Sequence, residues 1–441
     1  MSSRQYDIVL WGATGHTGGW TAKHIARSYP TDIRWAIAGR SESKLKFIAE
    51  SCAKINPDRV QPSIEICNLD EAELADLARK TAVLIATVGP FCVYGEPALK
   101  ACAENGTHYL DITGEIPWVL SMAKKYEKVA KTTGAVLISQ SAIESLPADL
   151  VAYAVVKRIH QELSTTTREI IFSVDDIKST FSGGTLHSIL EVVDNFSIAD
   201  FRRLKKPFVH STIPGPTAPT TQSVWTDILG VREHPDLGIL TTYFGASSDV
   251  PIVERSWGLI GNGKVYGSNF RFLEYARAKN LFLALFIHFV MKIGTILLKV
   301  PYATSAIRKV IPARGYGASE EETKSHFVEY RAVGRPNSDT STRAHARVRY
   351  EGGLYERKHS NPASLVLWTR RMMTVILMDA LLTFIVVSGL LVSQSALTLL
   401  KDDVTAKKLG GGFMTPATLG QPLIDRLAGL GFKIEVKMVN K

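Results

Sequence analysis

The order of the predicted elements indicates an α/β fold, with a doubly wound parallel sheet of the Rossmann type first and a mixed or antiparallel sheet after it. Short apolar runs alternate with helical segments through residue 139, and a glycine-rich turn opens the first helix. From residue 168 onward, several segments alternate polar with apolar residues, which is typical of a sheet with one covered face. A chain of 441 residues exceeds what one hydrophobic core usually serves, so two packed units are expected.

The glycine-rich turn lies between an apolar run at 6–10 and a helical segment at 20–28. Glycines suit such a turn because the backbone must approach a pyrophosphate closely, while the helix N-terminus supplies N–H donors. A tight loop without a ligand is the alternative, but the position at the start of a βαβ unit favours a dinucleotide site. The residues expected to contact the cofactor here are Gly12, Thr14, Gly15, Thr17 and Gly18.

The second predicted strand, 33–38, is followed by Arg40, Ser41 and Lys44 and by no carboxylate at its end. An acidic residue there would bind the ribose hydroxyls of NAD and repel a 2′-phosphate, whereas these three residues offer charge and donors to that phosphate. NADPH is therefore favoured over NADH. The alternative is that Arg40 is a solvated residue of a surface turn.

The alternation of strands and helices continues to residue 139, as a doubly wound parallel sheet requires. Ligands of such sheets bind beyond the carboxyl ends of the strands, so Gly89, Pro90 and the loop 113–115 are expected to face the nicotinamide. The further strands are predicted at 63–67, 82–88, 108–112 and 135–139, and the further helices at 71–80, 97–104 and 118–132.

The second unit is expected to lie over the open edge of the nucleotide crevice and to close the site. A helix is predicted from 183 to about 195, and 202–219 has the composition of a loop. Strands are predicted at 170–175, 238–244, 265–275, 326–333 and 344–350.

Several motifs together resemble a known family. They are GATGHTGG at 12–19, AGRSESKL at 38–45, TVGPFCVYGEPALKAC at 87–102, GTHYLDITGE at 106–115, FSGGTLHS at 181–188 and GGGFMTPATLGQPLIDRLAGLGF at 410–432. The chain is similar over nearly its whole length to the saccharopine dehydrogenase-like oxidoreductases and, within them, to the trans-acting enoyl reductases. The resemblance implies a Rossmann domain over 1–145, an inserted substrate domain over 146–400, and a segment over 401–441 that returns to the Rossmann domain.

The resemblance also implies an activity: NADPH-dependent reduction of a C=C bond in a polyketide or lipid acyl intermediate that a separate synthase builds, with the acyl chain free or on a carrier protein. The stretch 142–149 departs from the Gly-Phe-Asp-Ser-Ile-Pro-Ser-Asp-like sequence common in the family. It lacks the first aspartate, although Glu144 keeps a carboxylate one methylene longer.

Enoyl reduction requires a hydride for the β-carbon, a proton for the α-carbon and stabilisation of the enolate oxygen. Only the hydride comes from the cofactor, so side chains at predicted strand ends or at the start of the 183–195 helix are candidates for the rest. Each has a structural alternative: Tyr94 as a packed ring, Glu115 as a helix cap and His187 as a solvated residue. The candidates are Tyr94, Glu115, Glu144, Ser182, Thr185 and His187.

Composition limits the partners. The net charge of +10 indicates an anionic partner, but no basic stripe with interleaved aromatic residues suggests nucleic acid. The run 202–206 is either a docking site for an acidic carrier protein or a solvated loop. The four cysteines lack metal-ligand spacing, which predicts no metal and a reducing compartment, and the N-terminus does not resemble a secretory signal.

Two apolar segments, 281–298 and 372–392, explain the mean hydropathy of +0.04. The second is long enough to span a bilayer, but a single crossing would separate the C-terminal segment from the domain it is expected to rejoin. Interfacial attachment to the cytoplasmic side of a membrane or to a lipid droplet is favoured over packing in the core or in a homodimer interface.

Two other functions stay open on the sequence. A saccharopine reductase would act on a C–N bond, but its substrate carries several carboxylates and gives the apolar segments no use. A non-catalytic lipid-surface protein that keeps a nucleotide-binding fold is the third interpretation, because fold alone does not decide function.

Overall fold

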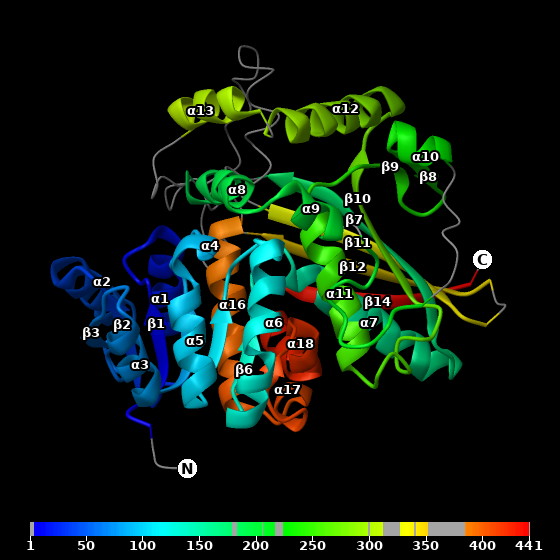
Figure 1. The fold of residues 1–441 in the computed structure, drawn as a ribbon. Helices are drawn as coiled ribbons and strands as arrows, with labels where there is room; N and C mark the ends of the chain where they lie inside the picture. Colours follow the sequence, from blue (N-terminus) through cyan, green and yellow to red (C-terminus); the bar gives the residue numbers. More distant parts are fainter. Residues whose placement is uncertain are drawn as a thin grey trace, which may run out of the picture.

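The computed structural model describes residues 4–178, 183–204, 206–216, 224–298, 300–311, 327–338, 341–351 and 384–440. It contains two seven-stranded sheets that lie side by side, each covered by helices (Figure 1). The first sheet is parallel and the second is mixed. The predicted fold class is confirmed.

The first sheet has the order β13-β6-β5-β4-β1-β2-β3. The central strand β1 (Tyr6–Trp11) pairs with β2 (Trp35–Gly39) on one side and β4 (Thr81–Ala86) on the other. The direction of winding reverses between β1 and β4, so a crevice opens at their carboxyl ends. The other strands are β3 (Ser63–Ile66), β5 (His108–Asp111), β6 (Val136–Ile138) and β13 (Gly412–Phe413).

Helices cover both faces of this sheet, which explains why its strands are nearly continuous apolar runs. In β1, Ile8 and Leu10 enter one core and Val9 and Trp11 enter the other. One face carries α1 (His16–Ser28), α2 (Glu42–Ile55) and α16 (Phe384–Lys401), and the other carries α3 (Glu71–Lys80), α5 (Glu96–Asn105) and α6 (Ile116–Thr133).

Helix α16 occupies a different place from the one favoured for the apolar segment 372–392. Leu390, Leu391 and Val392 are fully buried, and a β-carbon on Gly389 would lie 3.0 Å from the backbone nitrogen of Thr21 in α1. For the described residues 387–392, interfacial attachment is therefore wrong, because the helix is packed against α1 and the first sheet. Residues 372–383 lie outside the described part of the chain.

The second sheet has the order β14-β12-β11-β7-β10-β9-β8 and is antiparallel except between β7 and β10. Helices α7 (Leu146–Leu163) and α11 (Ala246–Leu259) pack on one of its faces. The strands are β7 (Thr167–Lys178), β8 (Val231–His234), β9 (Gly238–Thr241), β10 (Arg271–Ala278), β11 (Phe327–Pro336), β12 (Arg343–Glu351) and β14 (Lys433–Val439).

The strand predicted at 265–275 begins six residues later in the structure. Gly261, Asn262, Gly263 and Gly267 all have positive φ angles, so the chain turns repeatedly before β10 begins at Arg271. The alternation of the sequence continues through these turns, which is why the pattern misplaced the start of the strand.

The C-terminal segment joins both sheets, because β13 pairs with β6 and β14 pairs with β12. Buried polar groups fix it in place. The Asp149 carboxylate accepts hydrogen bonds from the Ser256 hydroxyl (2.5 Å) and the Ala417 N–H (2.7 Å), and the Arg255 guanidinium donates to the Phe413 carbonyl. The domain limits at 145 and 400 stay predictions.

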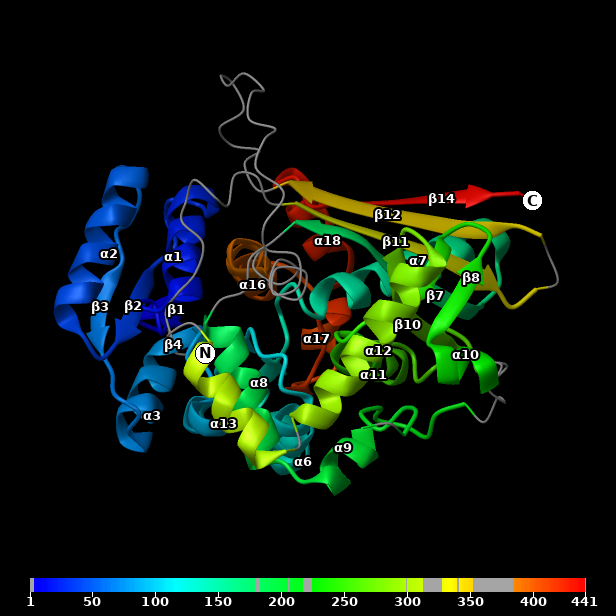
Figure 2. The same cartoon turned by 90° about the horizontal axis from the view of Figure 1, so that it is seen from above.

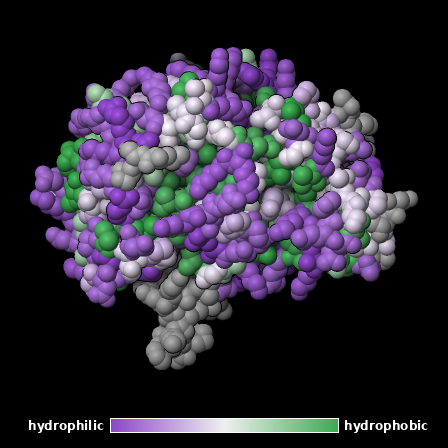
Figure 3. Space-filling view, turned by 90° about the horizontal axis from the view of Figure 1, so that it is seen from below, coloured by the Kyte–Doolittle hydropathy of each residue, from purple (hydrophilic) through white to green (hydrophobic). Residues whose placement is uncertain are grey.

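Four helices lie toward the carboxyl edge of the first sheet; α9 is at the side of the molecule beside α6, and the others lie above the sheets (Figures 1 and 2). On the face opposite α12 and α13, hydrophilic residues cover most of the surface and hydrophobic residues are scattered among them (Figure 3). Within the described residues, no helix combines the length and apolarity that crossing a membrane requires. The four helices are α8 (Gly183–Asn195), α9 (Ile198–Leu204), α12 (Leu281–Leu297) and α13 (Pro301–Val310).

Candidate active site

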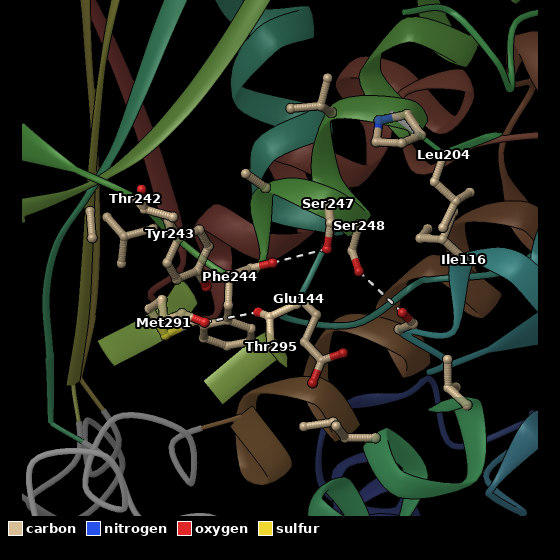
Figure 4. A pocket seen from close by; sticks show the side chains of 18 of the residues that line it. Ile116, Glu144, Leu204, Thr242, Tyr243, Phe244, Ser247, Ser248, Met291 and Thr295 are labelled. Carbon is tan, nitrogen blue, oxygen red and sulfur yellow. Dashed lines mark hydrogen bonds between the residues drawn. The ribbon is translucent and has the colours of Figure 1, made fainter. Parts of the chain in front are cut away.

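A cavity of about 2920 Å³ runs from the glycine-rich turn to α12. Figure 4 shows part of it from close by. This volume exceeds that of most small-molecule sites, so there is room for a dinucleotide end and a long ligand together. Many of the residues that line it are apolar, among them Phe91, Ile112, Phe244, Leu273, Phe286, Ile287, Val290 and Met291.

The glycine-rich turn has the close backbone contacts that a pyrophosphate site needs. Gly12 has a φ of +89°, and its carbonyl accepts the N–H of Gly15 at 2.9 Å. A β-carbon on Gly18 would lie 2.2 Å from the Gly12 carbonyl oxygen, so the turn and the first turn of α1 touch backbone to backbone. Gly15 and Thr17 line the cavity at the N-terminus of α1, where N–H groups can bind an anion.

The residues predicted to bind the 2′-phosphate gather at the end of β2. Arg40 and Lys44 are exposed and Ser41 precedes α2 as its N-cap residue. The Thr14 hydroxyl lies near Gly39, 3.7 Å from where a β-carbon would stand on that residue. Within the described part of the chain, neither Arg40 nor Lys44 forms an ion pair, which leaves both charges open to a phosphate.

The loop after β4 is held by Glu115. The Gly89–Pro90 peptide bond is cis, and both residues line the cavity. The Glu115 carboxylate accepts the N–H groups of Phe91 (2.8 Å) and Cys92 (2.6 Å) at the start of α4 (Phe91–Tyr94). Burial raises the pKa of Glu115, while these hydrogen bonds oppose the rise.

Glu115 therefore fixes the loop 89–92 rather than capping the helix that follows it. No side-chain cap bond from Glu115 to α6 is present, although the residue stands at the N-cap position of that helix. Its two oxygens are occupied by N–H donors, which suits a positioning role better than proton transfer.

Glu144 follows β6 and points into the cavity among Tyr243, Phe244 and Ser248 (Figure 4). A β-carbon on Gly114 would lie 2.1 Å from Oε2 of Glu144. Only a glycine at position 114 therefore leaves room for the Glu144 carboxylate over the loop after β5. Burial, and then the charge of Glu115, raises the pKa of Glu144 to about 7. No hydrogen bond or ion pair from the described residues reaches this carboxyl group, and with a pKa of about 7 about half of these side chains carry a proton at pH 7.

The structure ties the other catalytic candidates less closely to the cavity. His187 in α8 is half-buried and lines the cavity. Tyr94 ends α4 and is half-buried, but it does not belong to the cavity lining. Ser182 and the side chain of Thr185 lie outside the described part of the structure.

A pair of buried carboxyl groups, Asp249 in α11 and Glu274 in β10, was not predicted. Burial and the charge of Glu274 raise the pKa of Asp249, and burial raises that of Glu274 to about 8, so the pair retains at least one proton at neutral pH. Ser145, which follows Glu144 in the chain, donates a hydrogen bond from its hydroxyl to Asp249 Oδ1 at 3.1 Å. The two residues come from separate elements, and no spacing in the sequence joins them.

Burial also raises the pKa of Tyr243 well above its usual range, so its hydroxyl remains a donor at the wall of the cavity. Tyr243 follows β9, and no sequence motif predicted it as a site residue. Among the described residues, no cluster of histidine, cysteine and carboxylate side chains has the geometry of a metal site.

A parallel sheet whose carboxyl edge opens into a cavity under a second domain is the architecture of NAD(P)-dependent oxidoreductases. Residues 8–138 match the saccharopine dehydrogenase NADP binding domain. The predicted resemblance to the saccharopine dehydrogenase-like oxidoreductases and the predicted cofactor, NADPH, are confirmed.

Two relatives resemble the chain along most of its length. A trans-acting enoyl reductase of Mycobacterium ulcerans is 26% identical over 450 residues, which cover 98% of each chain. The saccharopine dehydrogenase (L-Glu forming) of Saccharomyces cerevisiae has a similar fold, with a TM-score of 0.54, 8% identity and coverage of 98% of this chain and 100% of that one.

Other relatives align over shorter regions. A Mycobacterium tuberculosis protein is 33% identical over 283 residues, 62% of this chain and 65% of its own length. The lipid droplet localized protein of Caenorhabditis elegans is 29% identical over 260 residues, 57% of this chain and 59% of its own length. The chain thus spans less than two thirds of these two proteins.

Proposed function

We propose that this protein is an NADPH-dependent enoyl reductase that reduces a C=C bond conjugated to the carbonyl group of a long acyl or polyketide chain. The observation that carries the proposal is Glu144, a carboxyl group with a pKa of about 7 that points into an apolar cavity beside the nucleotide-binding loops. The similarity to trans-acting enoyl reductases supports it.

The bound cofactor would supply the hydride for the β-carbon, with the glycine-rich turn, Arg40, Ser41 and Lys44 holding its phosphates. Loop 89–92, fixed by Glu115, and loop 113–115 form the walls against which the nicotinamide would lie. Both loops follow neighbouring strands, β4 and β5, so their positions relative to one another are set by the sheet.

Glu144 is proposed to donate the proton that the α-carbon requires. A carboxylic acid can do this at neutral pH only if its pKa lies near 7, which burial provides here. The Tyr243 hydroxyl is the proposed donor to the enolate oxygen, because it lines the same part of the cavity and stays protonated. The apolar walls would exclude water from the reacting atoms.

The substrate is proposed to be a long apolar chain because the cavity continues past Glu144 along α12. A carrier protein in trans is proposed as its source, because Arg202 and Arg203 are exposed on α9 and Lys206 lines the cavity. Lys205 lies outside the described residues. A saccharopine-type substrate fits less well beside Glu144, because no cation of the described residues reaches that carboxyl group. The basic residues of the lining lie elsewhere in the chain: Lys206, Arg271, Arg277, Lys279, Lys292 and Arg331.

Consumption of NADPH with 2-enoyl thioesters of increasing chain length tests this function. We expect turnover with C=C substrates, a KM that falls as the chain lengthens, and no turnover with imines of amino acids. Turnover of imines alone would favour a C–N oxidoreductase, and binding of NADPH without any turnover would favour the non-catalytic interpretation.

We further propose that the enzyme works at a membrane or lipid-droplet surface, since an apolar substrate is concentrated there. The similarity to a lipid droplet localized protein supports this proposal. A homodimer stays a prediction.

A further inference from the structure

Helix α12 exposes a row of large apolar side chains. Phe282 is 80% exposed and Phe289 is 47% exposed, and neither of these two residues lines the cavity. Ile293 and Ile296, 55% and 63% exposed, continue the row at helical spacing, and both also border the cavity. An exposed aromatic and aliphatic row of this length is unusual for a surface that only water contacts.

Helix α13 extends this surface. Val300 and Tyr302, 40% and 88% exposed, follow α12 directly in the chain. The surface formed by Phe282, Phe289, Ile293, Ile296, Val300 and Tyr302 is called the α12–α13 face below. The two helices that carry it lie above the sheets (Figures 1 and 2).

Exposed cations surround the face. Lys279 precedes α12, Lys292 lies on it, and Lys309 lies in the last turn of α13; Lys279 and Lys292 also border the cavity. Aromatic and aliphatic residues flanked by lysines suit an interface with anionic phospholipids, where apolar side chains enter the headgroup region and ammonium groups stay among the phosphates. On the opposite side of the molecule, hydrophilic residues predominate and hydrophobic residues lie between them (Figure 3).

The same helix forms a wall of the cavity. Leu283, Ile287, Val290 and Met291 line the cavity from α12, one turn or less from the residues of the exposed row. An apolar chain that leaves a lipid layer beside α12 would therefore reach the cavity without crossing water.

We propose that the α12–α13 face docks the protein onto an anionic phospholipid surface and that acyl substrates enter the cavity beside α12. The docking stands on the exposed residues alone, whereas the substrate route rests on the proposed enoyl reductase function. The surface lies parallel to α12, and the helix does not cross it.

Flotation of the full-length protein with vesicles tests the docking. We expect binding to vesicles of phosphatidylcholine with phosphatidylserine, and weaker binding to phosphatidylcholine alone. The triple variant Phe282→Ser, Phe289→Ser, Tyr302→Ser should lose more than about tenfold in binding, because three large apolar groups no longer leave water. None of the three residues lines the cavity.

The matched control removes three exposed apolar side chains elsewhere. Phe47, Val60 and Ile66 are 70%, 45% and 49% exposed on the first domain, and the variant Phe47→Ser, Val60→Ser, Ile66→Ser should bind vesicles as the wild type does. Equal binding by the wild type and the α12–α13 variant would overturn the proposal. A fall in the Tm of the α12–α13 variant would also overturn it, because the face would then be covered by other parts of the chain. A wild-type dimer that the variant breaks would overturn it as well, because a second copy would then cover the face.

Two substrates separate this proposal from the proposed function. The α12–α13 variant should reduce a short, water-soluble enoyl thioester at the wild-type rate and a long-chain substrate embedded in vesicles more slowly. If the wild type reduces neither substrate but binds vesicles, the enoyl reductase function fails and the docking stands.

Discussion

Replacing Glu144 with glutamine removes the proposed proton donor while keeping the size of the side chain. With a pKa of about 7, about a quarter of the Glu144 side chains are protonated at pH 7.5, against about one in a thousand for a glutamate with the usual value. A positioned general acid contributes about 10²- to 10⁴-fold to a rate, so kcat of Glu144→Gln is expected to fall by about that factor. The Kd for NADPH should not change, because the carboxylate does not reach the phosphate-binding residues.

The pH dependence of kcat gives a second readout. The protonated fraction of Glu144 falls about tenfold between pH 6 and pH 8 for a pKa of about 7, and the wild-type kcat should follow it. The assay is the loss of NADPH absorbance with a saturating 2-enoyl thioester from pH 5.5 to 9. Glu144→Gln should show a low rate without this decline.

Glu254→Gln is the matched control. Glu254 lines the same cavity, burial raises its pKa to about 7 as well, and its carboxylate accepts the N–H of Phe208 at 2.6 Å. It lies further along α11 than the residues around Glu144, and a glutamine can still accept that hydrogen bond, so kcat should stay near the wild-type value. A Glu144→Gln enzyme with the wild-type rate and the wild-type pH profile would refute the assignment.

Three further predictions concern the cofactor site and the buried acids. Arg40→Ala should weaken NADPH binding about 10- to 100-fold in a fluorescence titration and leave NADH binding unchanged, because a charge-assisted contact worth about 1.5 to 3 kcal/mol is lost; equal effects on both nucleotides would contradict a 2′-phosphate site. Gly18→Ala should abolish binding of either nucleotide and lower Tm, since its β-carbon would lie 2.2 Å from a backbone oxygen that cannot move freely; unchanged binding would exclude the close contact. Glu274 has a folded pKa of about 8, above its value of 4.5 in the unfolded chain. The folded state therefore binds the extra proton between these values, and stability should fall as pH rises from about 4.5 to 8. Glu274→Gln should flatten the decline of Tm over that range, and an unchanged slope would exclude this carboxyl group as the cause.

The first sheet was predictable because its strands are buried on both faces and its helices carry local signals. The helix predicted at 71–80 coincides with α3, where the Asp70 carboxylate accepts the N–H groups of Ala72 and Glu73. Glu144 and Glu115 were found for a related reason, since both follow strands of a parallel sheet and such loops meet at one edge.

Helix α16 shows where the sequence misled. A helix packed between a sheet and another helix is apolar all round, as a helix in a lipid layer is, so composition does not distinguish the two. The distinction lies in tertiary contacts, such as Gly389 against the backbone of Thr21 and the Tyr29 hydroxyl that donates to the Ser393 carbonyl. The Asp249–Glu274 pair was missed similarly, because its members meet only once α11 packs on β10.

The apolar cavity links the proposed chemistry to the proposed substrate. The low polarity that suits a long acyl chain is also what raises the pKa of Glu144 to about 7, because water is excluded from around its carboxyl group. Arginines placed directly beside Glu144 to bind a polycarboxylate substrate would lower that pKa and remove the proton donor at neutral pH. Acid catalysis by Glu144 and selection of an apolar substrate thus depend on the same walls, so a cation placed beside Glu144 should impair both.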